Sequence, residues 1–305
     1  MASTGSTSGF RTRWMPAGAI LKHELGSLLA SWLVRFWFTA TVVLTLLILA
    51  ANWGAAQTAP MLQAILFPYL VFPWFLVAMV LGISPVTGAR LDSLSDGILS
   101  RPVTRYEYLL AAWAARVIAV LGVYLTVMTP AGLLALFARR SVPADEVTVY
   151  GLIATLTVVG LIQAFLVTLG FLTGTLLRRP MLAAVVLVLV WLPVNLILST
   201  LSLEQFSPLT MYQAVPSLLR TPWTAIERAP APATTRDDAE ALEAQAEQFM
   251  RLLSGHSAPP RQQQAGLFEP RVFEELSVLR ILAGYGLPSL GALMLSLWIF
   301  NRRDL

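Results

Sequence analysis

Side chains that commonly carry catalysis or bind metal ions are scarce in this chain of 305 residues. The chain has no cysteine and only two histidines, His23 and His256, which lie too far apart to share one zinc-binding helix. Its single lysine, Lys22, lies in no glycine-rich phosphate-binding loop, and no G-x-S-x-G nucleophile motif occurs. We therefore expect no catalytic residue, no metal site and no cofactor site in this chain.

Charged residues that could pair with another protein gather instead in the polar segment 84–107. Three apolar side chains of this segment share one helical face: Leu91, Leu94 and Ile98. Three charged side chains lie off that face: Arg90, Asp92 and Asp96. Pro102 ends the helix, because proline cannot donate a backbone hydrogen bond. We expect a short cytoplasmic helix to which a motor protein could bind. The alternative is an amphipathic loop helix that lies on the lipid headgroups.

The composition of the whole chain is that of a membrane protein, with 56% hydrophobic and only 12% charged residues. Five long stretches carry no charge, and a helix of about 20 apolar residues crosses a bilayer. The longest stretch, 36–89, holds two crossings separated by a turn at 52–60. The pattern predicts an all-α integral membrane protein with six transmembrane helices: 32–53, 61–83, 109–137, 148–177, 181–203 and 281–300.

The basic residues predict how these spans are oriented. With the N-terminus inside, the short cytoplasmic segments hold eleven lysines and arginines, whereas the short outer turns hold two, Arg139 and Arg140. Because cytoplasmic loops are the more basic, we expect both termini in the cytoplasm and the protein in a bacterial inner membrane. The chain then has four parts: a cytoplasmic tail and surface helix (1–30), five spans with the polar loop 84–107 (31–203), an extracytoplasmic insertion (204–278), and the sixth span with the C-terminus (279–305).

Three segments outside the spans carry structural signals. Leucines at helical spacing in 17–31 predict an amphipathic helix in the membrane surface with Glu24 off its apolar face, or else an extension of the first span. Residues 206–223 are apolar but contain three prolines, which predicts a re-entrant or interfacial segment. Residues 237–253 have one apolar face, which predicts a packed outer helix.

The six predicted spans contain no aspartate, glutamate or histidine. Ion-driven transporters and proton pumps use such groups within the bilayer, so their absence argues against these classes. Two arginines, Arg35 and Arg116, lie near the cytoplasmic boundary, where their side chains are expected to reach water. Polar residues at depth, such as Gln163, suit interhelical hydrogen bonds or a weakly polar cavity. Gly170 and Gly174 form a G-x-x-x-G motif, which permits close packing within one chain or between two.

The end of the polar loop resembles a known signature. Residues 98–105, Ile-Leu-Ser-Arg-Pro-Val-Thr-Arg, are similar to the Leu-Leu-Ser-x-Pro-[Val/Ile]-[Ser/Thr]-Arg run in permease subunits of type-2 ATP-binding-cassette (ABC) exporters. Within that family the chain resembles the six-span group that includes copper-processing and gliding-motility permeases. The ending 300–305, Phe-Asn-Arg-Arg-Asp-Leu, is similar to the family's aromatic residue, basic pair and Asp-Leu. The chain departs from the family at 92–97 and at 112–113, where Glu-rich and Gly-Lys patterns are common.

The resemblance implies a membrane subunit that separate ABC ATPases drive. Two copies, or one copy with a similar permease, would bind two ATPase subunits, which would hold the ATP and Mg. The ATPases would push on the segment 90–100, and Arg101, Pro102 and Arg105 would connect that segment to the third span. The translocation path would lie at the dimer interface between spans 2 and 5, with four candidate lining residues: Pro68, Pro73, Pro193 and Asn195. The abundance of aromatic residues, 9 Trp, 14 Phe and 7 Tyr, favours a hydrophobic or amphipathic substrate.

Two other functions stay open from the sequence. The chain could be a mechanotransmitter or scaffold, in which ATP hydrolysis does work on a periplasmic partner through the acidic segment 204–275. It could also be a secondary transporter driven by an ion gradient, a reading that the missing intramembrane carboxylates disfavour. The net charge of +4 is explained by the membrane orientation, so no nucleic-acid partner is expected.

Overall fold

The computed structural model describes residues 8–83, 104–142, 145–177, 179–200, 207–220 and 278–302. Within these ranges the regular structure is helical and no strand occurs, so the predicted all-α class is confirmed. The helices are α1 (Ser8–Ala30), α2 (Trp32–Asn52), α3 (Thr58–Leu70), α4 (Trp74–Ile83), α6 (Arg105–Phe137), α7 (Val149–Leu176), α8 (Pro180–Thr200), α9 (Pro208–Leu219) and α11 (Val278–Asn301).

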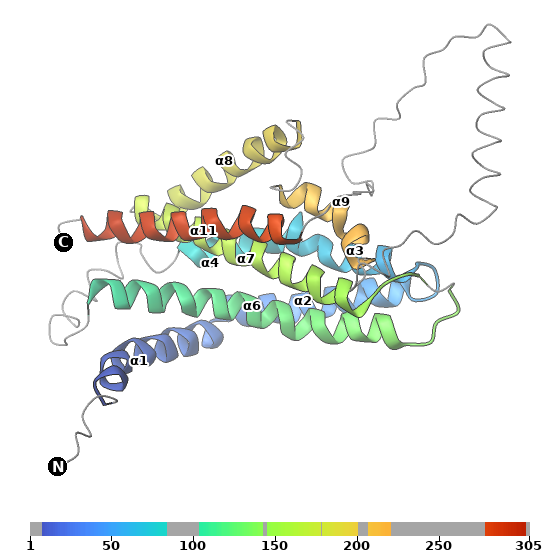
Figure 1. Ribbon diagram of the computed structural model, residues 1–305, viewed down its shortest axis with the longest axis horizontal. Helices are drawn as coiled ribbons and strands as arrows, with labels where there is room; N and C mark the ends of the chain where they lie inside the picture. Colours follow the sequence, from blue (N-terminus) through green and yellow to red (C-terminus); the bar gives the residue numbers. More distant parts are fainter. Residues whose placement is uncertain are drawn as a thin grey trace, which may run out of the picture.

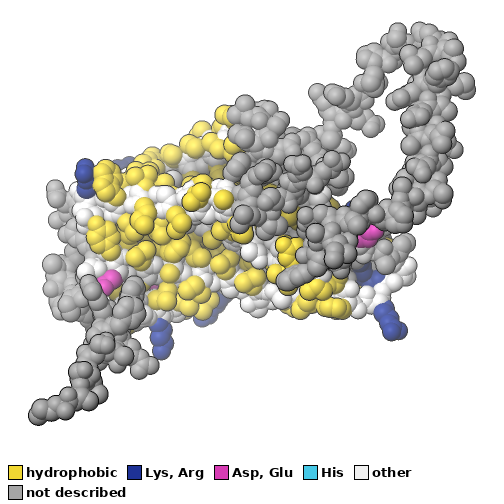
Figure 2. Space-filling view, in the orientation of Figure 1, with side chains coloured by type: hydrophobic (Ala, Val, Ile, Leu, Met, Phe, Trp, Pro, Cys, Tyr) yellow, Lys and Arg dark blue, Asp and Glu magenta, His cyan; other side chains and the backbone are white. Residues whose placement is uncertain are grey.

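Five helical segments are long and apolar enough to cross a membrane, which makes this a multi-pass membrane protein. They are Trp32–Asn52, Thr58–Ile83, Tyr106–Phe137, Val149–Leu176 and Ile281–Asn301. The remaining predicted span corresponds to α8, whose described apolar stretch, Pro180–Asn195, is shorter than about 20 residues. Apolar side chains cover the middle of the face shown in Figure 2, as a surface in contact with lipid requires.

Helix α7 is the central element of the bundle, and it contacts α4, α6, α8, α9 and α11. Figure 1 shows the start of α6 and the end of α11 at one end of the bundle, which we call the C-terminal end. The connection between α2 and α3, the connection between α6 and α7, and helix α9 lie at the opposite end. Helix α8 diverges from the other helices along its length.

Helices α4 and α7 interlock through three glycines, because a side chain at any of them would collide with the other backbone. A Cβ on Gly82 would overlap the carbonyl oxygen of Val167, and one on Gly170 would overlap that of Met79. A Cβ on Gly174 would lie 2.7 Å from the carbonyl oxygen of Ile83. The G-x-x-x-G motif therefore serves a contact within the chain, which decides between the two roles that the sequence allowed.

The second span is divided into α3 and α4 at residues 71–73. Proline at position 73 has no backbone N–H, so the carbonyl of Tyr69 lacks the donor that an unbroken helix would supply. Gln163 of α7 replaces that donor, and its Nε2 lies 2.6 Å from the Tyr69 carbonyl oxygen. An unpaired carbonyl in the bilayer is costly, so the fully buried Gln163 stabilises the break.

The other prolines within helices have different effects. Pro68 lies inside α3 and Pro130 inside α6, and both helices continue through them. Of the two prolines in the second span, Pro68 and Pro73, only Pro73 therefore coincides with a break in the helix.

Helix α9 is the described part of the segment 206–223, whose prolines predicted a re-entrant or interfacial segment. It is a helix of 12 residues with Pro208 in its first turn, where proline fits, and it continues through Pro216. Its buried side chains pack against α3 and α7. The predicted outer helix 237–253 lies outside the described residues.

Candidate functional site

The segment predicted to contact an ATPase connects α4 to α6 at the C-terminal end of the bundle. Most of its candidate residues lie outside the described residues: Arg90, Leu91, Asp92, Leu94, Asp96, Ile98, Arg101 and Pro102. The structure does show the two helix ends that bracket them, at Ile83 and Arg105. The segment therefore lies between α4 and α6 in the chain.

The start of α6 is held by a capping box that begins within the signature-like run, at Thr104. The hydroxyl oxygen of Thr104 accepts a hydrogen bond from the backbone N–H of Glu107 at 3.3 Å. The Glu107 carboxylate accepts one from the backbone N–H of Thr104 at 2.9 Å. Arg105, the last residue of the run, is the first residue of α6. Such caps contribute about 1 kcal/mol and prevent fraying, so the first turn of α6 moves with the rest of the helix.

A buried ion pair joins α6 to α1 three turns further along. Both terminal nitrogens of Arg116 lie 3.3 Å from one carboxylate oxygen of Glu24, and Nη1 also donates to the carbonyl of Ala112 at 2.6 Å. The Arg116 side chain is 0% exposed, so the expectation that it reaches water is wrong. Glu24 is also buried, so the expectation that it lies off the packed face of the N-terminal helix is wrong.

The physical reason for both corrections is the contact between α1 and α6. Figure 1 shows α1 beside the first part of α6, and the two helices share an extensive interface. The acid and the arginine face each other across that interface, where each offsets the desolvation of the other. Sequence periodicity within the N-terminal helix could not show that α6 carries a charge that pairs with Glu24.

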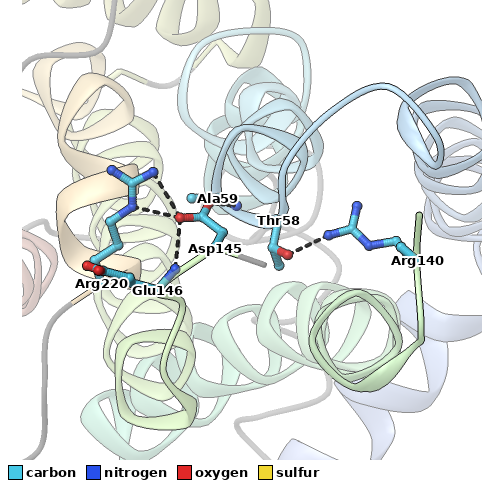
Figure 3. Close-up of polar contacts among 6 residues, drawn as sticks. All are labelled: Thr58, Ala59, Arg140, Asp145, Glu146 and Arg220. Atoms are coloured by element: carbon cyan, nitrogen blue, oxygen red, sulfur yellow. Dashed lines mark hydrogen bonds and ion pairs between the residues drawn. The ribbon is translucent and has the colours of Figure 1, made fainter. Parts of the chain in front are cut away.

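A second polar cluster lies at the opposite end of the bundle and centres on Asp145 (Figure 3). One carboxylate oxygen accepts from the backbone N–H of Ala59, in the first turn of α3, at 2.9 Å. The other accepts from Nε and Nη2 of Arg220 at 3.1 and 3.0 Å, and from the backbone N–H of Glu146. A carboxylate is favourable at a helix N-terminus. We call Asp145, Arg220 and Ala59 the clasp, because they join α3, α9 and the connection before α7.

Arg140 adds a parallel contact at the same end. Its guanidinium donates to the carbonyl of Ala56 at 3.0 Å and to the hydroxyl of Thr58, and it lies 5.9 Å from the centre of the Trp53 ring. These contacts tie the connection after α6 to the turn between α2 and α3. The connection after α6 is therefore packed against that turn through Arg140.

Helix α9 is also attached to the start of α7 by its backbone. The N–H of Thr148 donates to the carbonyl of Leu219 at 3.1 Å. A Cβ on Gly151 would overlap that same carbonyl oxygen, so only glycine permits this approach. The side chain of Gln63 donates to the carbonyl of Tyr212 at 3.0 Å, and burial raises the pKa of the Tyr212 phenol above its ordinary value. Helices α3, α7 and α9 therefore form one unit at this end.

The four candidate residues of the translocation path lie in two separate settings. Pro68 is buried in α3 and Pro73 lies at the break before α4. Pro193 is an exposed residue of α8. Asn195 is buried, and it accepts from the hydroxyl of Ser207 at 2.9 Å and donates to the carbonyl of Trp191. The polar groups of Asn195 therefore tie α8 to the start of α9.

No arrangement in the described part of the chain points to a metal ion, because no three aspartate, glutamate or histidine side chains gather there. Comparison with protein families finds no matching family model, and no curated protein matches the sequence.

Sequence reasoning missed the contacts of Glu24, Arg116, Asp145 and Arg220, whereas it expected Gln163 to suit an interhelical hydrogen bond, which the structure shows to the Tyr69 carbonyl. Only Gln163 had a usable signal in the sequence. A side-chain amide in one span can donate to the backbone carbonyl that a proline in another span leaves without a donor. The remaining contacts join residues 75 or more positions apart, so no local spacing marks them.

Proposed function

We propose that this chain is the membrane-spanning permease subunit of a type-2 ABC exporter. In this proposal two permease subunits span a bacterial inner membrane with their termini in the cytoplasm, and two ATPase subunits bind ATP and Mg. Hydrolysis drives export of a hydrophobic or amphipathic substrate. The observation that carries the proposal is the segment between Ile83 and Thr104. It contains most of the signature-like run 98–105, whose last two residues form the capped start of α6 at the C-terminal end of the bundle.

The described contacts support a mechanical path from this segment to the other side of the membrane. Helix α6 has 33 residues, about 50 Å, and exceeds a hydrocarbon core of about 30 Å. Its capped first turn therefore lies outside that core, and the Glu24–Arg116 pair makes α1 move with it. The segment begins at the end of α4, which interlocks with α7 through the three glycines. The start of α7 is in turn hydrogen-bonded to α9 at the opposite end of the bundle.

The exposed face of α8 is the surface on which the proposal places the second permease subunit. Helix α8 diverges from the bundle in Figure 1, and it presents a row of exposed apolar side chains: Met181, Leu182, Val185, Val186, Leu189, Val190, Val194 and Ile197. A second permease packed on this face would bring two copies of α8 together. Helix α8 also contacts α4, so a path between spans 2 and 5 would follow this interface, as proposed for Pro68, Pro73, Pro193 and Asn195.

Co-purification with an ABC ATPase encoded beside the chain tests the proposal. The tagged wild-type chain is expected to retain the ATPase and to support ATP turnover. An Asp92→Ala/Asp96→Ala/Arg101→Ala variant is expected to lose both, whereas the control Arg139→Ala, at the opposite end of the bundle, is expected to retain both. If the wild type binds no ATPase, the exporter proposal fails.

The same preparation separates the two alternative functions. A mechanotransmitter would bind the ATPase through the same segment but release no lipid-like substrate from ATP-loaded vesicles. Its activity would instead require a periplasmic partner of the segment 204–275. A secondary transporter would accumulate substrate under an ion gradient without ATP.

A further inference from the structure

A groove of about 400 Å³ lies where α1 gives way to α2 beside α6. Its walls are almost entirely apolar and come from all three helices: Leu25, Leu29, Val34, Phe38, Ile118 and Val123, among others. Along α6 the lining extends from Ile118 to Thr126, which is about 12 Å at 1.5 Å per residue. The groove therefore spans a large part of one leaflet of a bilayer whose hydrocarbon core is about 30 Å thick.

One charged side chain, Arg35, lines this groove. It lies in the first turns of α2, and its Nε donates to the carbonyl of Leu29 at 3.3 Å. That bond fixes the plane of the guanidinium and leaves its two terminal nitrogens without a partner among the described residues. Two parallel N–H groups of a guanidinium are suited to a phosphate.

The charges around the groove favour an anion. The described ranges contain four acidic side chains, Glu24, Glu107, Asp145 and Glu146, and none of them lines the groove. Glu24, the acid on the adjoining part of α1, is paired with Arg116. The groove therefore offers an apolar channel with an uncompensated positive charge among its lining residues.

We propose that this groove binds an anionic phospholipid, with an acyl chain along α6 between α1 and α2 and the headgroup phosphate on Arg35. This site is independent of the proposed transport function, because it requires only that the chain spans a membrane. A lipid there touches the first helix, the first span and the third span at once, next to the Glu24–Arg116 pair. It would hold α1 against α6 by filling the space between them.

Gly122 provides a direct way to fill the groove without disturbing the helices. It lies in the groove wall, and a Cβ built on it meets no atom within 4 Å. A leucine at this position would occupy the acyl-chain volume. Gly286 of α11 is the matched control, because a Cβ there also meets nothing within 4 Å and the residue lies outside the groove.

Native mass spectrometry of the purified full chain with equal amounts of dioleoylphosphatidylglycerol and dioleoylphosphatidylcholine tests the site. We expect the wild type to retain phosphatidylglycerol about fivefold over phosphatidylcholine, the factor that one basic group near the membrane surface supplies. Arg35→Gln should reduce this preference to about one, and Arg35→Lys should keep part of it. Gly122→Leu should lower retention of both lipids, whereas Gly286→Leu and Arg139→Gln should behave as the wild type.

Two results would overturn the proposal. If Arg35→Gln keeps the wild-type preference, Arg35 does not hold the phosphate. If Gly122→Leu melts at the wild-type temperature and retains both lipids as the wild type does, the groove is not the site. Arg35 is exposed, so Arg35→Gln is expected to fold normally and decides the question even if Gly122→Leu is unstable.

Discussion

Replacing the two members of the Glu24–Arg116 pair, singly and together, should show strong non-additivity. Arg116 is 0% exposed and Glu24 has a side chain only 10% exposed, so neither charge can be hydrated when its partner is removed. Loss of one partner of a buried pair costs about 3–5 kcal/mol, whereas replacing both by apolar residues of similar volume is close to neutral. Glu24→Met and Arg116→Met should therefore each lower the free energy of unfolding by about 3 kcal/mol or more.

The double variant Glu24→Met/Arg116→Met should lose less than either single variant. The assay is unfolding in mixed detergent micelles, followed by helical circular dichroism, for the wild type, both single variants and the double variant. Lys22→Met is the matched control, because Lys22 is an exposed residue of the same helix, and it should change the free energy of unfolding by less than about 0.5 kcal/mol. A double variant whose loss equals the sum of the two single losses would refute the reasoning that the two charges offset each other.

Three further predictions concern close contacts elsewhere in the bundle. Gly170→Ala should destabilise the protein by several kcal/mol, because the added methyl group would overlap a carbonyl oxygen of α4. The control Gly286→Ala should be neutral or stabilising. Equal melting temperatures for the two variants would contradict the described packing of α4 against α7. Asp145→Asn should lower the free energy of unfolding by about 2 kcal/mol, because it weakens the hydrogen bonds to Arg220 and to the start of α3. The loss should be measurable as faster limited proteolysis at the end of α9. An unchanged digestion rate would show that the clasp does not hold α9. Gln163→Leu should lower the free energy of unfolding by about 1–3 kcal/mol, because it leaves the Tyr69 carbonyl at the α3–α4 break unpaired. A variant as stable as the wild type in the same micelle assay would show that this carbonyl needs no donor.

The fold class and five of the membrane spans could be predicted because their signal is local. An uncharged stretch of about 20 residues is sufficient to identify a crossing, and the described helices agree with the predicted spans to within a few residues. The break in the second span was also accessible, because Pro73 removes a backbone donor wherever it occurs. Pro68 and Pro130 show the limit of that rule, since α3 and α6 continue through them.

The polar contacts could not be predicted because they depend on which helices become neighbours. Glu24 and Arg116 are 92 residues apart, and Asp145 caps a helix 86 residues earlier in the chain. A rule that single arginines near a boundary reach water gave the wrong answer for Arg116, since it ignores a partner on another helix. The G-x-x-x-G motif likewise indicated close packing but not the partner, which is α4.

The central claim is that an ATPase binds the segment between α4 and α6 at the C-terminal end of the bundle. The chain has no cysteine, so a single introduced cysteine reports one position without further mutation. We would measure cross-linking of Asp96→Cys to the co-expressed ABC ATPase, with Ser141→Cys at the opposite, clasp end as the control. The account predicts a cross-link from position 96 that changes in yield when ATP is added, and none from position 141. A cross-link from position 141, or none from position 96 in a preparation that retains the ATPase, would contradict it.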